Sequence, residues 1–342
     1  MISSWFVEDL VKPDWPEKSA NHMIQCVGGS SLSKAKDFIE KSVPADKRDK
    51  VTALEGYDKV YADENVDCVY IGTPHAFHKQ NCLDAIAAGK NVLCEKPFTM
   101  NAKEAEEVFA AAEKKGVFVM EAMWTRFYPL MKKIRQLLYE EQKIGKIYRT
   151  FCDFGLDIDI QSLPPDSRYK DPALGAGSLL DIGIYSLTWG IWTLTDKEGD
   201  AAEDPEVSST QTVAHNVDVA SSVLLHYKST GRQAICSSTT NYPFRNDWAR
   251  IEGSKGHIVL SGGAPSAPEQ FTFYPKDGGK EEHFTFDKPG RGFWWEADAV
   301  ARDIKAGRKQ NATMPWAETL RVMRIMDGVR KRGGAKFPND PW

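Results

Sequence analysis

The first 123 residues alternate short apolar runs with amphipathic helical patterns, and this alternation limits the folds open to the chain. Strands are expected at residues 22–29, 66–72, 91–94 and 117–120. Helices are expected at 33–40, 76–88 and 102–115. Buried strands followed by helices of this length form parallel sheets with right-handed crossovers. The pattern predicts a Rossmann-like, doubly wound parallel α/β domain over residues 1–123.

The remainder of the chain has a different pattern of apolar and polar residues. After a helical pattern at 128–141, longer runs alternate with a period of two, which is typical of antiparallel strands. These runs lie at 146–157, 218–227, 232–240, 249–252, 257–260 and 270–273, and helical patterns follow at 294–306 and 317–332. A chain of 342 residues exceeds what one core usually serves. We therefore expect a second, α+β domain with a large open antiparallel sheet over residues 124–342.

Composition narrows the class of protein. Hydrophobic residues make up 42% and charged residues 27%, a globular balance. The net charge is -4 and no basic tract is present, so no nucleic-acid partner is expected. The apolar runs are too short for a bilayer, and no signal-like segment is found, so we expect a cytoplasmic protein without membrane contact. The six scattered cysteines have no metal-ligand spacing, so we expect reduced core thiols and no metal.

The junctions after the predicted parallel strands are the candidate sites, because ligands bind beyond the carboxyl ends of such sheets. Thr73 and Pro74 follow one strand, and ordinary helix capping would explain them. Glu95 and Lys96 follow the next strand. A charged pair directly after a buried strand is costly unless it has a role. We therefore predict that Glu95 and Lys96 have a functional role in the site.

A glycine-rich run at 175–185 opens a helix in the second half. Asp181 and Tyr185 are four residues apart and so share a helix face. Taken alone, this run is explained by an acid near a helix dipole and a tyrosine in the core.

Three motifs in this order resemble the glucose–fructose oxidoreductase/inositol dehydrogenase (Gfo/Idh/MocA) family. They are EKP at 95–97, EAMWTRF at 121–127 and GSLLDIGIY at 177–185, and the stretch FWWEADAVARDIKAG at 293–307 also matches. Within the family, the chain most resembles the dimeric dihydrodiol dehydrogenases and the NADP-dependent D-xylose dehydrogenases. The likeness spans nearly the whole chain.

The resemblance implies that Lys96 and Tyr185 flank the substrate and the nicotinamide. A tyrosine with its ordinary pKa of about 10 is too protonated to accept a hydroxyl proton, and a nearby ammonium favours the phenolate. The hypothesis is Tyr185 as general base, Lys96 as its activator and a hydroxyl ligand, and Asp181 orienting a substrate hydroxyl or Lys96. The residues that would line the substrate pocket are Trp124, Arg126, Phe127 and Arg168.

The resemblance also implies cofactor contacts at the ends of the first strands. The positions that would pass beside the cofactor are Thr73, Pro74, His78, Glu95 and Lys96. Cofactor choice is made after the second strand of the sheet, where an acid would hold the ribose 2′-hydroxyl of NAD. The segment 28–34 has no acid and offers Ser30, Ser31 and Lys34, which favours NADP over NAD. Serines that start a helix are also ordinary caps.

The start of the chain departs from the family pattern. Relatives begin with a strand and a G-x-G-x-x-small turn, which brings the pyrophosphate close to a helix N-terminus. Here the first helix starts at once, and Ser3 aligns with the last small residue of that turn. Gly28 and Gly29 follow the wrong strand to replace it. Either the true start lies roughly a dozen residues upstream, or the central strand is missing, which would weaken the dinucleotide site.

The expected function is NADP-dependent oxidation of a hydroxyl on a cyclic sugar, with D-xylose oxidised at C1 to the lactone as the leading candidate. One alternative is trans-dihydrodiol oxidation, since the aromatic residues Trp124, Phe127, Trp294 and Trp295 would suit a flatter substrate. Another is a cofactor-poor, non-catalytic homologue, because the glycine turn is missing.

A homodimer formed between sheets is also expected. Alternation at 218–227 places two sets of side chains on opposite faces of the strand, and neither set is charged in mid-strand, which is unusual for a surface in water. The two sets are Val219, Ser221, Val223, Leu225 and Tyr227, and Ala220, Ser222, Leu224 and His226.

Overall fold

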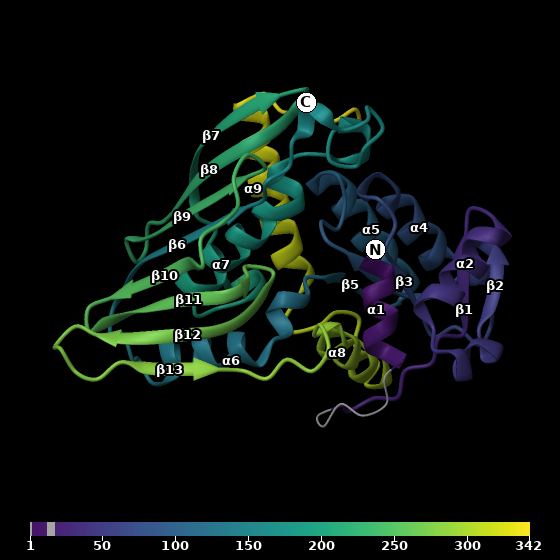
Figure 1. Cartoon of the computed structure of the whole chain (residues 1–342), viewed down its shortest axis with the longest axis horizontal. Coiled ribbons are helices and arrows are strands. Elements are labelled where there is room, and N and C mark those ends of the chain that lie inside the picture. Colours follow the sequence, from purple (N-terminus) through teal and green to yellow (C-terminus); the bar gives the residue numbers. More distant parts are fainter. Residues whose placement is uncertain (1, 12–17) are drawn as a thin grey trace.

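The N-terminal part alternates short parallel strands with helices, as the sequence predicts (Figure 1). The computed structural model describes residues 2–11 and 18–342. The elements in chain order are α1 (Ile2–Val11), β1 (Cys26–Gly29), α2 (Leu32–Ser42), β2 (Thr52–Glu55), α3 (Asp58–Ala62), β3 (Cys68–Ile71), α4 (His78–Ala87), β4 (Asn91–Glu95), α5 (Ala102–Lys115) and β5 (Val119–Ala122). Strand β2 and helix α3 were not predicted, because each is only one short run with few apolar residues.

The parallel strands fall into two separate sheets. β1 pairs with β2, and β3, β4 and β5 form the other sheet in that order. Among the described residues, no strand joins β1 to β3. Helix α1 contacts both sides of this junction: the Ser3 hydroxyl donates to the carbonyl of Gly72 over 3.3 Å, and Phe6 stacks on Tyr70 of β3 with ring centroids 3.7 Å apart. Further along the helix, Val7 packs with the apolar side of α2.

The end of α1 is tied to a helix near the other terminus. Asp9 is buried, and its carboxylate accepts hydrogen bonds from the backbone N–H groups of Arg291, Gly292 and Phe293 at 2.8–3.0 Å. These groups lie at the start of α8 (Phe293–Lys305), where unsatisfied N–H groups and the helix dipole favour an anion. Burial raises the pKa of Asp9, and the three backbone hydrogen bonds oppose that rise.

The second half of the chain builds an eight-stranded sheet. The strand order is β13-β12-β11-β10-β6-β9-β8-β7. The strands are β6 (Ile147–Gly155), β7 (Glu206–Ala214), β8 (Val217–Tyr227), β9 (Arg232–Thr239), β10 (Asp247–Gly253), β11 (Gly256–Ala264), β12 (Ala267–Pro275) and β13 (Glu282–Thr285). Neighbours are antiparallel except β6 and β9, which run parallel, so the sheet is mixed rather than purely antiparallel. The two edge strands, β7 and β13, were not predicted because they carry few apolar residues.

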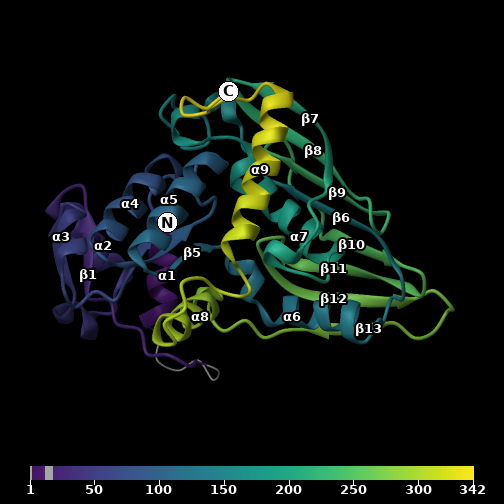
Figure 2. The ribbon, with the colours of Figure 1, turned by 180° about the vertical axis from the view of Figure 1, so that it is seen from behind.

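Helices cover one face of this sheet and connect it to the N-terminal part. The helices against the sheet are α6 (Pro129–Arg135), α7 (Ile184–Leu194) and α9 (Trp316–Gly333), whereas α8 packs on α1. α7 packs on β6 and β9, while α9 contacts α5 and β5 on one side and β7 on the other. Figure 2 shows α9 running between the two parts. One hydrophobic cluster includes Met120, Phe127 and Leu225, so the apolar core continues across the expected boundary at residue 123.

Strand β8 has the predicted alternation. Its first set of side chains (Val219, Ser221, Val223, Leu225, Tyr227) is buried, with exposed fractions of 6% or less. The second set (Ala220, Ser222, Leu224, His226) is half-buried or exposed. One face of the sheet therefore supports the core, and the other remains open in the single chain. No helix among the described residues has the length and apolarity needed to cross a membrane.

Candidate active site

The end of β4 and the start of α7 bring Lys96 and Asp181 together. Lys96 follows β4 directly, and Asp181 lies in a π-helical turn, η7 (Leu179–Gly183), that leads into α7. The Lys96 ammonium donates to the backbone carbonyl of Asp181 over 2.6 Å and lies 3.3 Å from its carboxylate. Arg168 donates to the other carboxylate oxygen over 3.2 Å. One carboxylate is therefore held between two cations.

A buried carboxylate fixes the start of η7. Gly177 has a φ of 133° and faces Asp218 of β8, so a side chain at this position would be strained and would collide with that carboxylate. Asp218 accepts hydrogen bonds from the backbone N–H of Leu179 at 2.7 Å and from the hydroxyl of Ser178 at 2.8 Å. The glycine and the serine of the GSLLDIGIY motif thus anchor the turn that carries Asp181 to the large sheet.

Tyr185 lies against the Lys96–Asp181 pair. Its side chain is 5% exposed, and the Lys96 ammonium is 4.8 Å from its ring centroid. The indole N–H of Trp124 donates to the Tyr185 hydroxyl oxygen over 3.0 Å. Trp124 is fixed in turn by stacking on Phe293 of α8, with ring centroids 4.1 Å apart. Four of the predicted catalytic and substrate residues therefore meet here, with Arg168 at the outer edge.

The charges of this cluster stabilise one another. Burial would raise the pKa of Asp181, but Lys96, Arg168 and His75 outweigh it and hold that pKa at about 2. Burial would likewise lower the pKa of Lys96, yet the neighbouring Tyr185, Asp181 and Glu95 leave it raised. Both members of the pair are therefore charged across the neutral range.

The Lys96 ammonium lowers the pKa of Tyr185, but burial outweighs this effect. Burial raises the pKa of Tyr185 to about 12, and the favourable effect of the Lys96 ammonium offsets only part of that rise. Glu95 adds to the rise, whereas the hydrogen bond from Trp124 opposes it. Tyr185 is thus a phenol at neutral pH, and its oxygen already has one donor fixed in place.

Glu95 faces a second, acidic environment. Its carboxylate accepts a 2.7 Å hydrogen bond from the Tyr70 hydroxyl and another from the backbone N–H of Lys96. Burial raises the pKa of Glu95 to about 7, against the effects of Tyr70 and Lys96. Glu296 of α8 is fully buried nearby, and within the described part of the chain neither of its oxygens has a hydrogen-bond partner. Burial, and then the charge of Glu95, raise the pKa of Glu296 well above its usual value.

The segment after β3 contributes a residue that the sequence did not single out. His75 is buried and close enough to Asp181 for that carboxylate to raise its pKa, although burial dominates and lowers the pKa to about 3. His78, which was expected beside the cofactor, lies between the backbone carbonyls of Thr73 and Pro97 at 2.8 and 2.9 Å. His78 thus links the two loops. The sequence offered no pattern that separates the roles of these two histidines.

Arg126 and Phe127 lie apart from Trp124, although the three share the 3₁₀ turn η3 (Trp124–Phe127). Arg126 is buried and pairs with Glu318 of α9 over 3.1 Å. Phe127 lines a different cavity. The turn therefore directs its side chains to three different places. Within the described part of the chain, neither Arg126 nor Phe127 makes a hydrogen bond or ring contact with Tyr185.

The cluster and the fold together match one family. The oxidoreductase family with an NAD-binding Rossmann fold (GFO_IDH_MocA) matches residues 9–123, and the GFO/IDH/MocA C-terminal domain matches residues 131–259. The chain belongs to the Gfo/Idh/MocA family. It is therefore a member of an oxidoreductase family whose N-terminal domain is of the NAD-binding kind.

Curated members of the Gfo/Idh/MocA family are similar over nearly the whole chain. D-xylose 1-dehydrogenase (NADP(+)) of Hypocrea jecorina is 33% identical over 341 residues, covering 93% of this chain and 85% of the relative. Trans-1,2-dihydrobenzene-1,2-diol dehydrogenase of Xenopus tropicalis is 32% identical over 331 residues, covering 94% and 92%. The Homo sapiens protein of the same name is 31% identical over 334 residues, covering 94% and 92%.

Solved structures share the fold at lower identity. Aldose-aldose oxidoreductase from Caulobacter crescentus has a TM-score of 0.76 at 23% identity, covering 94% of this chain and 92% of the other. Levoglucosan dehydrogenase, in complex with NADH and levoglucosan, has a TM-score of 0.79 at 16% identity, covering 97% and 93%. These likenesses show the architecture of the Gfo/Idh/MocA family, with a parallel α/β part followed by a large sheet.

The residues after β1 include groups that can bind a phosphate. Ser31 caps α2 by accepting the backbone N–H of Lys34, and the Lys34 ammonium donates to the Ser30 hydroxyl over 3.1 Å. Two hydroxyls and an exposed ammonium, with no acid between residues 28 and 34, suit a 2′-phosphate. No binding site for the pyrophosphate is identified among the described residues, because they include no glycine-rich turn leading into α1. Among the residues described, no group of three or more His, Cys, Asp or Glu side chains could hold a metal ion.

Proposed function

We propose that the chain is an NADP-dependent dehydrogenase that oxidises a hydroxyl group of a cyclic sugar. D-Xylose, oxidised at C1 to the lactone, is the first substrate to test. The observation that carries the proposal is the buried Lys96–Asp181–Tyr185 cluster at the carboxyl end of β4. The similarity to a D-xylose 1-dehydrogenase over most of the chain supports the choice of substrate.

The proposed chemistry uses Tyr185 as the proton acceptor and Lys96 as its charged neighbour. NADP⁺, when bound, supplies the acceptor for the hydride. The Tyr185 oxygen takes the hydroxyl proton, while the Lys96 ammonium stabilises negative charge on that oxygen. Trp124 donates to the same oxygen and fixes its position. Asp181 holds Lys96 by two contacts, so the ammonium is already oriented before substrate binds.

Because the pKa of Tyr185 is raised, the rate of the proposed oxidation depends on pH. Only the phenolate accepts a proton. With a pKa of about 12, the phenolate fraction at lower pH rises about tenfold for each unit by which the pH increases. Oxidation is therefore expected to become faster as the pH rises. The reverse reaction needs the phenol, which is fully populated at neutral pH.

A second candidate substrate is a trans-dihydrodiol. Trp124 lies beside Tyr185 and stacks on Phe293, and Phe154 packs against the Tyr185 ring from the large sheet. These flat apolar surfaces suit a cyclohexadiene ring. Relatives named trans-1,2-dihydrobenzene-1,2-diol dehydrogenase support this alternative at the same level of identity.

A non-catalytic homologue is the third candidate. The observation in its favour is that β1 and β3 are not joined by a strand in the described structure. A dinucleotide site that bridges two unpaired sheets would bind its ligand weakly. Titration with NADP separates this candidate from the two enzymes.

We further propose a cytoplasmic homodimer that forms between the open faces of two large sheets. The open face carries apolar side chains, including exposed Leu224 of β8 and half-buried Ile235 of β9 and Phe151 of β6. All six cysteines are free thiols, which suits a reducing compartment. Sedimentation at micromolar concentration tests the dimer, and a clean monomer would count against it.

The test of the proposed function is a substrate panel with NADP, comparing pentoses, hexoses and dihydrodiols. The wild-type protein is compared with Tyr185→Phe, which removes only the proton-accepting oxygen, and with Tyr242→Phe, which changes a tyrosine that is 74% exposed. Turnover of D-xylose should be abolished by Tyr185→Phe and unchanged by Tyr242→Phe, while both variants keep their NADP affinity. Near-normal rates in Tyr185→Phe across the pH range would contradict the assignment of the base.

A further inference from the structure

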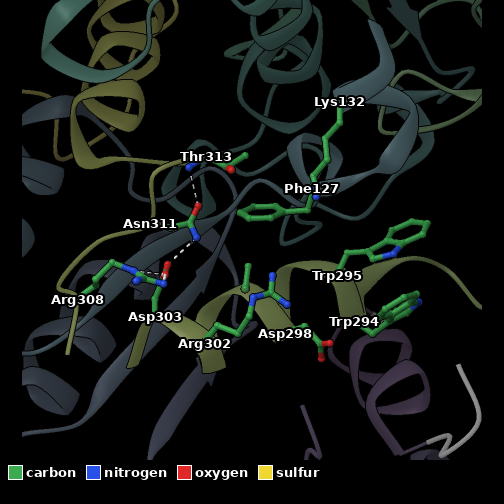
Figure 3. Close-up of a pocket in the computed structure, with 11 residues that line it drawn as sticks. Phe127, Lys132, Trp294, Trp295, Asp298, Arg302, Asp303, Arg308, Asn311 and Thr313 are labelled. Carbon is green, nitrogen blue, oxygen red and sulfur yellow. Dashed lines mark hydrogen bonds and ion pairs between the residues drawn. The ribbon is translucent and has the colours of Figure 1, made fainter. Parts of the chain in front are cut away.

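A cavity of about 340 Å³ lies on the outer side of α8, and neither Lys96 nor Tyr185 lines it. Figure 3 shows α8 on one side, Phe127 and Lys132 on another, and the segment after α8 with Asn311 and Thr313 on a third. The lining residues of α8 recur as adjacent pairs every four positions, which places them on one helix face. These are Trp294 and Trp295, Asp298 and Ala299, and Arg302 and Asp303. The cavity is thus built by three separate segments and is distinct from the candidate active site.

Both carboxylates in the cavity wall already have partners. Asp298 accepts hydrogen bonds from the backbone and the hydroxyl of Ser19 and lies 2.7 Å from the imidazole of His22. Asp303 pairs with Arg308 and accepts a 2.6 Å hydrogen bond from the Asn311 amide. Neither acid is available to hold a cationic ligand.

The donors around the same cavity are largely unused. The Lys132 ammonium has no hydrogen bond or ion pair to any described residue. Among the same residues, the Arg302 guanidinium bonds only the Ser19 hydroxyl, which leaves most of its N–H groups free. The indole N–H of Trp295 is buried and has no partner within the described part of the chain. Lys132 and Arg302 therefore add two cations beside two acids that already have partners, and the free groups are donors rather than acceptors.

The floor of the cavity is aromatic. Phe127 and Trp294 are almost fully buried, and Trp295 lies beside them with a tilted contact to Trp294 at 5.0 Å. A cavity of a few hundred Å³ has the size of a small-molecule site. Most of its lining is polar, and the aromatic side chains add a smaller apolar part. We propose that it binds a small organic anion, whose phosphate or carboxylate lies between Lys132 and Arg302 and whose carbon frame packs on Phe127 and Trp295.

The proposal is tested by calorimetric titration with inorganic phosphate, ribose 5-phosphate and citrate. The comparison is between the wild type, Lys132→Gln, the double variant Lys132→Gln/Arg302→Gln, and a control, Lys305→Gln/Lys331→Gln. The control removes two exposed cations outside the cavity. Each cavity substitution should weaken binding at least about tenfold, the loss expected for one charge-assisted hydrogen bond, while the control binds as the wild type does. Because the Lys132 ammonium bonds no described residue, its single variant should fold normally.

Three results would overturn the proposal. They are no saturable binding up to about 10 mM of any probe, equal weakening in the cavity and control variants, and displacement of the bound anion by NADP. The last would place the anion in the dinucleotide site. Tyr185→Phe should bind the anion as the wild type does, so the outcome is independent of the proposed dehydrogenase function.

Discussion

The end of β4 separates two buried clusters of opposite electrostatic character. On one side, Asp181 lies between Lys96 and Arg168, and its pKa is held at about 2. On the other, Glu95 and Glu296 are two acids close together, and burial raises the pKa of Glu95 to about 7. All these carboxylates are shielded from water, so burial alone does not decide whether a carboxylate is charged. Direct ion pairs do, because Asp181 pairs with both Lys96 and Arg168, whereas Lys96 lowers the pKa of Glu95 without outweighing burial.

This difference in charge indicates that the two clusters at the end of β4 have different roles. The mixed cluster keeps its charges and so holds Lys96 in a fixed orientation beside Tyr185. In the acidic cluster, Glu95 has a pKa of about 7 and carries only part of a charge at neutral pH, and the pKa of Glu296 is raised as well. Three substitutions, taken from the largest expected effect to the smallest, test this difference in roles.

Lys96→Met removes the cation that distinguishes the two clusters. We expect kcat to fall by at least about a thousandfold, because both the stabilisation of the phenolate and a hydroxyl ligand are lost. Steady-state kinetics with the preferred sugar checks this, with Lys103→Met as a control, since Lys103 is an exposed residue on α5. Activity within about tenfold of the wild type would show that Lys96 does not assist the base.

Asp181→Asn keeps the shape of the mixed cluster but removes its anion. We expect kcat to fall by about ten- to a hundredfold, since Lys96 loses part of its fixed orientation. Asp181 has a folded pKa below its ordinary value, so its contribution to stability is present above about pH 4 and is lost as the pH falls towards 2. Urea unfolding should therefore show a loss of about 2 kcal/mol at pH 7 that shrinks at pH 3. A loss that does not depend on pH would mean that the ion pair is not its source.

Glu296→Gln should stabilise the protein. Glu296 has a folded pKa above its ordinary value, so the wild type loses stability as the pH rises through and above the ordinary range of a glutamate. The advantage of the amide should grow with pH, by at most about 1.4 kcal/mol per pH unit. Thermal melts at pH 5 and pH 8 check this, with Glu64→Gln at an exposed site as the control. If the variant melts lower at pH 8, Glu296 has a partner that the amide cannot replace.

The sequence predicted the mixed cluster better than the acidic one. Lys96, Asp181 and Tyr185 stand in short motifs at a strand end and a helix start, positions whose location follows from the order of elements. Glu296 lies within an amphipathic helix, and its burial depends on how α8 packs against the rest of the molecule. Trp124, Arg126 and Phe127 diverge because a tight 3₁₀ turn rotates successive side chains by a large angle. Adjacency in sequence could not show that Phe127 enters another cavity.

The fold was predictable to a similar extent. Apolar strands separated by helices identified the parallel part, and period-two alternation identified the long strands of the second sheet. The pairing of β6 with β9 could not be predicted, because a strand that is buried on one face has the same alternation beside a parallel or an antiparallel neighbour. The polar edge strand β7 was missed since its side chains are mostly Ser and Thr.

The bond between Asp9 and the start of α8 has a consequence for synthesis in the cell. Its two ends are 282 residues apart, so α1 leaves the ribosome long before its capping partner exists. At about 5–20 residues per second, the delay is roughly a quarter of a minute to one minute. During that interval β3 and α2 can already cover Phe6 and Val7, but the backbone donors at the start of α8 do not yet exist. The attachment of α1 to α8 is therefore expected to be a late step when the protein folds during synthesis.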